Sequence, residues 1–301
     1  MELTILGCYS ATPRPKTRPT AQILSVKNHL FLIDCGEGTQ VQLRNCKIKF
    51  SRIKHVFISH LHGDHYFGLI GLISTFLLLA RETELHIYGP KGIKEVIMLQ
   101  LKLGKSWVNF PLTFHELESK DSEIIFEDEK VTVQTIPLKH RIYTNGFLFK
   151  EKIGDRKVDI ESVKNNNIDI SYCQKIKKGF DIKNEKGILI PNKKISFDPD
   201  PPKSYAFCSD TQFYPACIPI IKNSTVLYHE SSFLDEHEHL CAATRHSTAK
   251  QAAEIAKQAN VKKLILGHYS TRYPNIEKFK MEAKQIFENV ELARDGLVFK
   301  I

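Results

Sequence analysis

The segment His60-Leu-His-Gly-Asp-His65 places three imidazoles and one carboxylate within six residues. It follows the apolar run at residues 56–59, which predicts a buried strand that ends in a loop. Imidazole and carboxylate groups are ligands for Zn²⁺, and also for Mn²⁺ or Fe²⁺. The chain must therefore fold so that further ligands reach the end of this strand, and no other feature of the sequence constrains the fold as strongly.

The spacing of these four residues divides them into two pairs. His60 and His62 are separated by one residue, so both project from the same side of an extended segment. Gly63 permits a sharp turn, after which Asp64 and His65 can point at a second metal ion. Two ions about 3.5–4 Å apart activate a bridging water molecule and stabilise both oxygens in phosphoryl transfer. A chance cluster of histidines or a structural metal loop is the alternative interpretation of the motif.

Polar residues directly after later apolar runs offer the remaining ligands. They are His140 after residues 131–138, Asp210 after residues 205–209 and His268 after residues 264–267. Each residue taken alone is an ordinary loop residue. Together with the motif at 60–65 they predict one site where the loops of several strands converge.

Alternating apolar runs and turn signals predict an α/β fold, an αββα sandwich of two packed sheets with helices outside. Strands are expected at residues 3–7, 20–26, 30–34, 55–59, 85–88, 124–126, 131–136, 146–151, 204–209, 225–229 and 263–266, with a final pair within 290–301. Helices are expected at residues 68–80, 93–103, 248–259 and 277–287, with Ser247 as the cap of the third. We expect a single domain over residues 1–301.

The net charge of +9 is concentrated in one segment. Residues 139–194 contain 14 Lys and Arg against 7 Asp and Glu, so seven of the nine surplus charges lie there. Asn- and Gly-containing turns interrupt this segment, and its apolar residues are sparse, which predicts an arm inserted at about 152–195. A basic arm can bind phosphates by Coulomb attraction. A solvated lysine-rich loop is the alternative.

Several classes of protein are disfavoured by the sequence. No apolar run reaches the roughly 18 residues of a membrane helix, and the N-terminus lacks the pattern of a signal peptide. The seven cysteines are scattered and include no Cys-x-x-Cys pair, which is typical of reduced thiols. We therefore expect a cytoplasmic protein with no membrane partner and no organic cofactor.

These motifs resemble the metallo-β-lactamase superfamily, whose mark is His-x-His-x-Asp-His, and within it the short form of the ribonuclease Z family. Phe31-Leu-Ile-Asp-Cys-Gly-Glu-Gly-Thr-Gln40 matches a segment of that family. The other matching segments are residues 59–65, 137–140, 209–211, 229–233, 246–249 and 267–273. The resemblance therefore covers nearly the whole chain.

The resemblance implies a zinc-dependent endoribonuclease that removes the 3′ trailer from pre-tRNA. The cut falls after the discriminator base and leaves a 3′-hydroxyl on the tRNA and a 5′-phosphate on the trailer. Two Zn²⁺ per subunit and a homodimer are implied as well. The implied ligands are His60, His62 and His140 for one zinc, Asp64, His65 and His268 for the other, and Asp210 as the bridge.

The resemblance also implies catalytic roles. Asp64 would orient or deprotonate the attacking water, and His246 would protonate the leaving ribose 3′-oxygen. Glu230 would hold the tautomer of His246, with a buried salt-bridge partner as the alternative. Asp34 is expected to anchor its Gly-rich loop rather than to bind metal.

Substrate contacts are implied at two places. Lys16 and Arg18 lie in a loop at residues 13–20 that resembles the family's loop near the acceptor end, although Pro19 stands where the family has Asn. Lys175, Lys177 and Lys178 lie in the arm, which lacks the family's Gly-Pro turn.

Two other functions remain open. A small-molecule hydrolase of the same fold, such as a phosphodiesterase or thioesterase, would need no basic arm. A noncatalytic RNA-binding protein would not need the complete ligand set.

Overall fold

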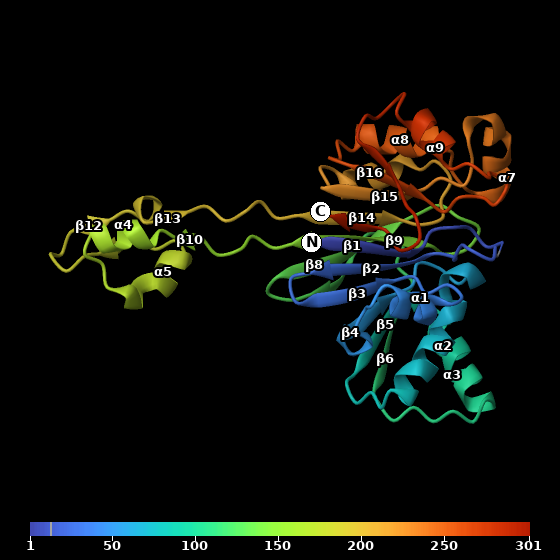
Figure 1. Ribbon diagram of the computed structural model, residues 1–301, viewed down its shortest axis with the longest axis horizontal. Helices are drawn as coiled ribbons and strands as arrows, with labels where there is room; N and C mark the ends of the chain where they lie inside the picture. Colours follow the sequence, from blue (N-terminus) through green and yellow to red (C-terminus); the bar gives the residue numbers. More distant parts are fainter. Residues whose placement is uncertain (13) are drawn as a thin grey trace. The chain divides into compact units, whose positions relative to one another are not determined.

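The computed structural model describes residues 1–12 and 14–301 (Figure 1). Pro13, which begins the loop at 13–20, lies outside the described residues. The chain divides into two compact units. Unit 1 comprises Met1–Lys150 and Lys203–Ile301, and unit 2 comprises Glu151–Pro202.

The first sheet of unit 1 has seven strands in the order β18-β1-β2-β3-β4-β5-β6. They are β18 (Val298–Lys300), β1 (Glu2–Gly7), β2 (Ala21–Val26), β3 (His29–Ile33), β4 (Ile53–Phe57), β5 (Leu85–Pro90) and β6 (Leu112–Leu117). Strands β3 to β6 are parallel, and the crossovers between them carry α1 (Thr39–Asn45), α2 (Gly63–Leu78) and α3 (Ile93–Leu103). These helices bury Leu43, Leu72 and Ile97 in one cluster with the sheet.

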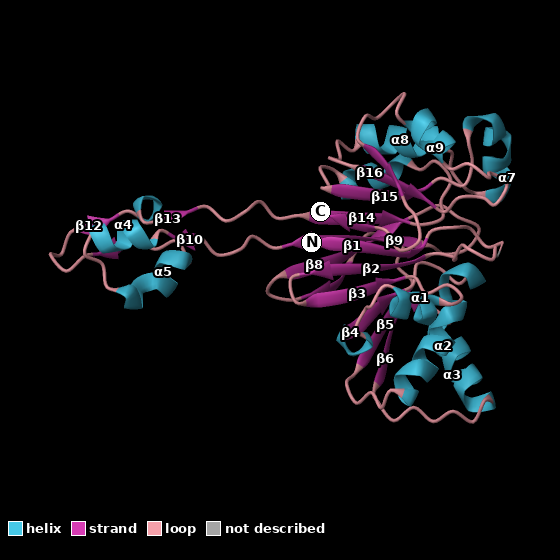
Figure 2. Cartoon of the chain, viewed as in Figure 1, coloured by secondary structure: helices cyan, strands magenta, loops and turns pink. Residues whose placement is uncertain are grey.

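The second sheet has seven strands in the order β17-β16-β15-β14-β9-β8-β7. They are β17 (Val290–Leu292), β16 (Leu264–Gly267), β15 (Val226–Glu230), β14 (Ser204–Cys208), β9 (Asn145–Glu151), β8 (Val131–Pro137) and β7 (Ile124–Glu127). Strands β14 to β17 are parallel. The larger helices on its outer face are α8 (Ala249–Gln258) and α9 (Glu277–Ala283) (Figure 2). The short helices α6 (Ile218–Ile221) and α7 (Cys241–Thr244) follow β14 and β15 in the chain.

Aromatic side chains join the two sheets face to face. The ring centroids of Phe57 and Phe147 are 5.4 Å apart, and those of Phe31 and Phe149 are also 5.4 Å apart. All four side chains are fully buried, and each large aromatic ring removes much apolar surface from water. The predicted αββα sandwich is therefore confirmed.

Two local predictions were wrong at helix starts. Helix α2 begins at Gly63 rather than at residue 68, because the polar residues of the metal motif themselves form its first turn. Thr248, not Ser247, caps α8: its hydroxyl accepts a hydrogen bond from the backbone N–H of Gln251, and the Gln251 side chain accepts one from the backbone N–H of Thr248. The Ser247 hydroxyl instead donates to the Thr211 carbonyl.

Unit 2 has a small core of its own. Its regular elements are β10 (Lys157–Val158), α4 (Ile160–Asn165), α5 (Cys173–Lys177), β11 (Ile182–Lys183), β12 (Leu189–Ile190) and β13 (Ser196–Phe197). The core residues are Val163, Ile168, Ile176, Ile182, Ile190 and Ile195. The buried amide of Asn192 donates to the carbonyls of Ile176 and Phe180, which ties α5 to the following turn. No helix among residues 1–12 and 14–301 is long and apolar enough to cross a bilayer.

Four histidines lie at the start or middle of neighbouring strands β3 to β6 in the first sheet. They are His29, His55, His86 and His115. His55 stacks on His86 with ring centroids 4.9 Å apart, and His86 Nδ1 is 3.2 Å from His115 Nε2. Burial, followed by the neighbouring imidazole of His86, lowers the pKa of His55 to about 3. The folded protein therefore holds His55 neutral under mildly acidic conditions.

Because the folded protein holds His55 neutral, we expect the protein to lose stability in mild acid. In the unfolded chain His55 takes up a proton below pH about 6.5, whereas the folded chain resists it. The free energy of unfolding should therefore fall by up to about 2 kcal/mol between pH 7 and pH 5, less where solvent screens the exposed edge of the ring. Urea unfolding at both pH values should show a smaller fall in His55→Phe. Equal pH dependence in the two proteins would contradict the prediction.

Candidate active site

Four loops that follow strands of the two sheets meet at one edge of unit 1. The parallel arrangement of β3 to β5 and of β14 to β16 places the C-terminal ends of neighbouring strands together. The first candidate ligand after each strand is His60 after β4, His140 after β8, Asp210 after β14 and His268 after β16. Because α2 starts at Gly63, Asp64 and His65 lie in its first turn.

The first group of candidate ligands is His60, His62, His140 and Asp210, whose ligand atoms lie within 4.8 Å of one another. His62 Nδ1 is 3.0 Å from His60 Nε2 and 3.2 Å from His140 Nε2. Asp210 Oδ2 lies 3.6 Å from His60 Nε2. Three imidazole nitrogens and one carboxylate oxygen thus face a common point.

The second group is Asp64, His65 and His268. Asp64 Oδ2 is 3.4 Å from His65 Nε2 and 3.5 Å from His268 Nε2. The other oxygen of Asp210, Oδ1, is 3.4 Å from His65 Nε2 and 3.2 Å from His268 Nε2. Asp210 therefore reaches both groups through different oxygens, and the structure brings together all seven residues that the sequence predicted as ligands.

Unpaired buried atoms test whether these residues fit metal ions. Among the residues that the structure describes, His65 Nε2, His268 Nε2 and Asp210 Oδ1 are buried and have no hydrogen-bond partner. A buried polar atom without a partner is costly, and a divalent cation would satisfy all three. Nitrogen and carboxylate donors are suited to Zn²⁺. The donor set therefore fits a pair of metal ions.

The remaining ring nitrogens of these histidines are held by hydrogen bonds. His65 Nδ1 is 2.7 Å from Asp34 Oδ2, and His268 Nδ1 is 2.9 Å from Ser232 Oγ. His140 Nδ1 donates to the Arg245 carbonyl at 2.8 Å. Such bonds fix the ring orientation and tautomer, so that the opposite nitrogen points at the metal position. Asp34, expected to anchor its loop, also accepts from the backbone N–H of Ser59 at 2.7 Å.

The Gly-rich segment at residues 31–40 permits the close approach of α2. A Cβ atom on Gly68 would lie 2.0 Å from the Gly36 carbonyl oxygen, and one on Gly36 would lie 2.5 Å from the Asp64 carbonyl oxygen. Both positions therefore exclude side chains. This contact places the first turn of α2, with Asp64 and His65, against the loop that carries Asp34.

His246 and Glu230 form an ion pair beside the candidate ligands. His246 Nδ1 lies 2.8 Å from Glu230 Oε1. Burial is the largest single influence and lowers the pKa of His246, but the charge and hydrogen bond of Glu230 together with the charge of Asp210 raise it to about 9. Glu230 is fully buried and also accepts hydrogen bonds from the backbone N–H groups of Thr211, Ser232 and Ser247. The pair thus supplies a protonated imidazole in a fixed orientation.

A cavity of about 420 Å³ opens over the candidate ligands. It is lined by Ser10, Ala11, Thr12, His62, Gly63, Asp64, Arg141, Asp210, Ser232, Phe233, Thr244, His246, His268 and Ser270. The sequence did not single out Arg141 or Phe233. The only available signal for Arg141 was its position directly after His140.

The residues predicted to bind substrate lie elsewhere. Lys16 is exposed, and the Arg18 guanidinium donates to the carbonyls of Pro15 and Thr17, within its own loop. Neither residue lines the cavity of about 420 Å³. In unit 2, Lys175 is exposed and its Nζ lies 5.5 Å from the centroid of the Tyr172 ring.

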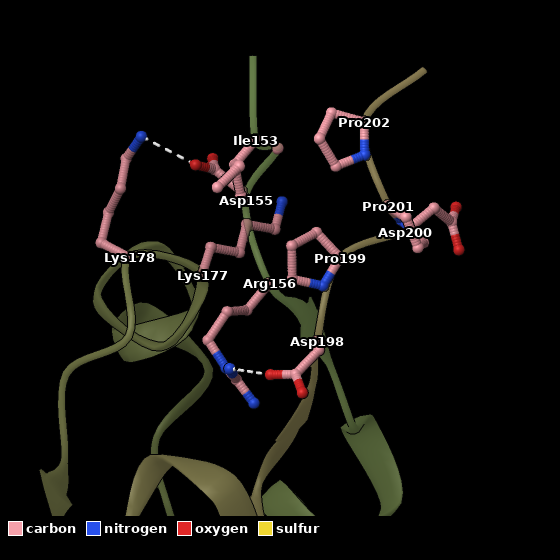
Figure 3. Close-up of a pocket in the computed structure, with 11 residues that line it drawn as sticks. Ile153, Asp155, Arg156, Lys177, Lys178, Asp198, Pro199, Asp200, Pro201 and Pro202 are labelled. Carbon is pink, nitrogen blue, oxygen red and sulfur yellow. Dashed lines mark hydrogen bonds and ion pairs between the residues drawn. The ribbon is translucent and has the colours of Figure 1, made fainter. Parts of the chain in front are cut away.

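A second cavity, of about 480 Å³, lies within unit 2 (Figure 3). Lys177 and Lys178 line it together with Arg156. Ion pairs join Lys178 to Asp155 at 2.9 Å and Arg156 to Asp198. Acidic side chains thus neutralise part of the basic charge at this place.

The comparisons with known proteins agree with this geometry. A family model described as "Anti-Pycsar protein Apyc1" matches residues 1–170. The protein named ribonuclease Z of Bacteroides fragilis is 42% identical over 300 residues, which cover 100% of this chain and 99% of that protein. The ribonuclease Z of Cytophaga hutchinsonii is 44% identical over 301 residues, covering 100% and 96%.

Solved structures give the same result. The crystal structure of human tRNase Z, short form, has a TM-score of 0.74 at 27% identity and covers 100% of this chain and 99% of that one. The metallo-β-lactamase fold protein YhfI of Bacillus subtilis, at 17% identity and a TM-score of 0.69, supports the fold. The match to the Apyc1 family model ends inside unit 2, at residue 170, whereas the ribonuclease Z relatives span all or nearly all of the chain. Over residues 1–170 the chain therefore belongs to the Apyc1 family, and as a whole it belongs to the ribonuclease Z family.

Proposed function

We propose that this chain is a zinc-dependent endoribonuclease that removes the 3′ trailer from pre-tRNA, cutting after the discriminator base. Members of the ribonuclease Z family are hydrolytic endoribonucleases, and the human structural relative is named tRNase Z. The observation that carries the proposal is the Asp210 carboxylate, which lies between two groups of ligand atoms. It lies next to the ion pair of protonated His246 with Glu230. The proposed products are a tRNA with a 3′-hydroxyl and a trailer with a 5′-phosphate.

The proposed metal site holds two Zn²⁺. His60, His62 and His140 would hold one ion, Asp64, His65 and His268 the other, and Asp210 both. When bound, the ions polarise the phosphodiester and make water a better nucleophile. The outer hydrogen bonds of Asp34, Ser232 and the Arg245 carbonyl keep the histidine rings in place.

Two side chains of the protein would manage the protons of the reaction. As water forms its bond to phosphorus, the Asp64 carboxylate accepts a proton from it. As the bond between phosphorus and the ribose 3′-oxygen breaks, His246 donates its Nε2 proton to that oxygen. Glu230 would hold the Nδ1 side of His246 through a contact of 2.8 Å, which both the tautomer-holding role and a buried salt bridge require.

The second unit is the proposed tRNA-binding arm. Its Lys and Arg residues attract the phosphate backbone in a salt-dependent manner. Phe180 is 60% exposed and Tyr172 is 37% exposed, so both rings are available to an RNA partner. Lys16 and Arg18 are proposed to contact the acceptor end, and Lys175, Lys177 and Lys178 the body of the tRNA.

Homodimer formation and a cytoplasmic location are proposed as well. Large apolar side chains are exposed on and after α2 and α3, notably Leu78 at 85%, Leu103 at 74% and Trp107 at 82%. Self-association would remove such exposed apolar side chains from water. All seven cysteines are free, which supports a reducing compartment.

Asp210→Asn tests the shared metal ligand. The variant should bind less metal and cleave pre-tRNA about 100-fold more slowly or worse, because the amide cannot supply an anionic bridge. Metal content by mass spectrometry and cleavage should be measured on the same sample, which also identifies the metal. Asp128→Asn, at the distant pair with His29, is the matched control and should retain both. Unchanged metal content and cleavage in Asp210→Asn would reject the site.

His246→Ala tests the proton donor. The kcat for pre-tRNA should fall about 10²–10⁴-fold, because the ribose 3′-oxygen is a poor leaving group without a proton. Hydrolysis of bis(p-nitrophenyl) phosphate should change little, because p-nitrophenolate leaves without protonation. An equal fall for both substrates, at unchanged metal content, would contradict the role.

Deleting residues 155–190 tests the arm. The KM for pre-tRNA should rise about 10²-fold or more as phosphate contacts are lost, while bis(p-nitrophenyl) phosphate is hydrolysed as before. A milder variant replaces Lys175, Lys177 and Lys178 by Gln. Its control replaces the exposed Lys222, Lys257 and Lys262 of unit 1 by Gln, with the same change in charge. Intact pre-tRNA cleavage after the deletion would sink this proposal and favour a small-molecule hydrolase.

A further inference from the structure

Arg141 lies directly after the candidate ligand His140, in the loop that follows β8. Its side chain lines the cavity of about 420 Å³ together with His62, Asp210 and His246. The residue as a whole is exposed, whereas His140 and Asp210 are buried. Arg141 therefore lies at the rim of the cavity rather than among the ligand atoms.

The Arg141 guanidinium carries a positive charge beside the cavity. Among residues 1–12 and 14–301 no side chain forms an ion pair or hydrogen bond with it. Its charge nevertheless reaches into the site. Burial is the main cause that lowers the pKa of His62, and the Arg141 charge lowers it further; the same charge opposes the raised pKa of His246. A permanent positive charge thus lies beside the cavity with its hydrogen-bond donors available.

The neighbouring residue Lys139 makes this placement specific. Lys139 is also exposed and also carries a positive charge, on the other side of His140. Its backbone is tied to Thr211 and Gln212, and its side chain does not line the cavity. Of the two flanking cations, only Arg141 faces the site.

We infer that Arg141 binds a phosphate of the RNA next to the phosphodiester that is cut, and so favours RNA over small phosphodiesters. An RNA strand carries a phosphate at every nucleotide, so when the reacting phosphate lies at the ligand atoms, a flanking one lies near the rim. The planar guanidinium can donate two N–H groups to one phosphate. This inference rests on the proposed function. It assigns Arg141 a contact with the substrate but no part in forming or breaking a covalent bond.

Arg141→Gln is compared with Lys139→Gln, since both remove one positive charge beside His140. For pre-tRNA, Arg141→Gln should lower kcat/KM about 10–100-fold, mainly through KM, because a charge-assisted hydrogen bond is lost. Its hydrolysis of bis(p-nitrophenyl) phosphate should equal that of the wild type, since that substrate has no flanking phosphate. Lys139→Gln should match the wild type on both substrates.

The salt dependence of pre-tRNA binding gives a readout that misfolding would not produce. The slope of log affinity against log salt should become shallower by about 0.7–0.9 in Arg141→Gln, the share of one phosphate contact. Arg141→Lys should restore the slope, because it keeps the charge, but only part of the affinity, because it lacks the planar fork.

Three outcomes would reject the assignment or its basis. Unchanged cleavage of pre-tRNA by Arg141→Gln overturns the inference and leaves the proposed function standing. An equal loss on both substrates also overturns it, because Arg141 would then act on the reacting phosphate or on the fold. A wild-type protein that hydrolyses bis(p-nitrophenyl) phosphate but not pre-tRNA rejects the proposed function itself.

Discussion

The candidate site depends on one carboxylate, which the packing of the two sheets places among the candidate ligands. Asp210 extends from the second sheet, while the residues of the motif at 60–65 extend from the first. Its two oxygens face different groups of ligand atoms, at 3.2–3.6 Å from their nearest nitrogens. The aromatic packing between the sheets therefore affects the candidate site, because a change in sheet separation would pull Asp210 away from one group. The packing that stabilises the core therefore also sets the geometry of the candidate site.

Contacts among hydroxyl and carboxylate groups hold the loops of the candidate ligands in position. Ser209 Oγ donates to Ser59 Oγ at 3.0 Å, which links the loops after β14 and β4. Ser59 in turn contacts Asp34, the partner of His65. On the other side, Ser232 contacts both Glu230 and His268. Each ligand loop is thus held by a neighbour from another strand, which explains how loops keep the positional accuracy that metal binding requires.

The sequence predicted the sandwich and the residues that the structure brings together, because both rest on local patterns, but it missed α1 and β6. Apolar runs marked the strands, and a polar residue at each run's end marked where the loops meet. The start of α2 was missed because its first turn consists of the metal motif, which has no helical periodicity. The Thr248 cap was misplaced by one residue because Ser247 has the same chemistry and only its partners, Thr211 and Glu230, distinguish it. Arg141 was overlooked because the sequence does not tell which of the two cations that flank His140, Lys139 or Arg141, faces the cavity. The sequence also does not show that the Arg18 guanidinium donates to carbonyls of its own loop, because those hydrogen bonds depend on the conformation of the loop.

Unit 2 is connected to the second sheet at a place in the chain that tolerates change. It is inserted between β9 and β14, which are neighbours in the second sheet, and Lys150 pairs directly with Ser204 across its ends. In topological terms the whole unit is the loop of a β-hairpin. The entropy of closing a loop grows only slowly with its length, so such a connection tolerates lengthening, shortening or replacement at little expense to the sheet. Unit 2 can therefore change in length or sequence while the pairing of β9 with β14 and the candidate ligands of unit 1 stay in place.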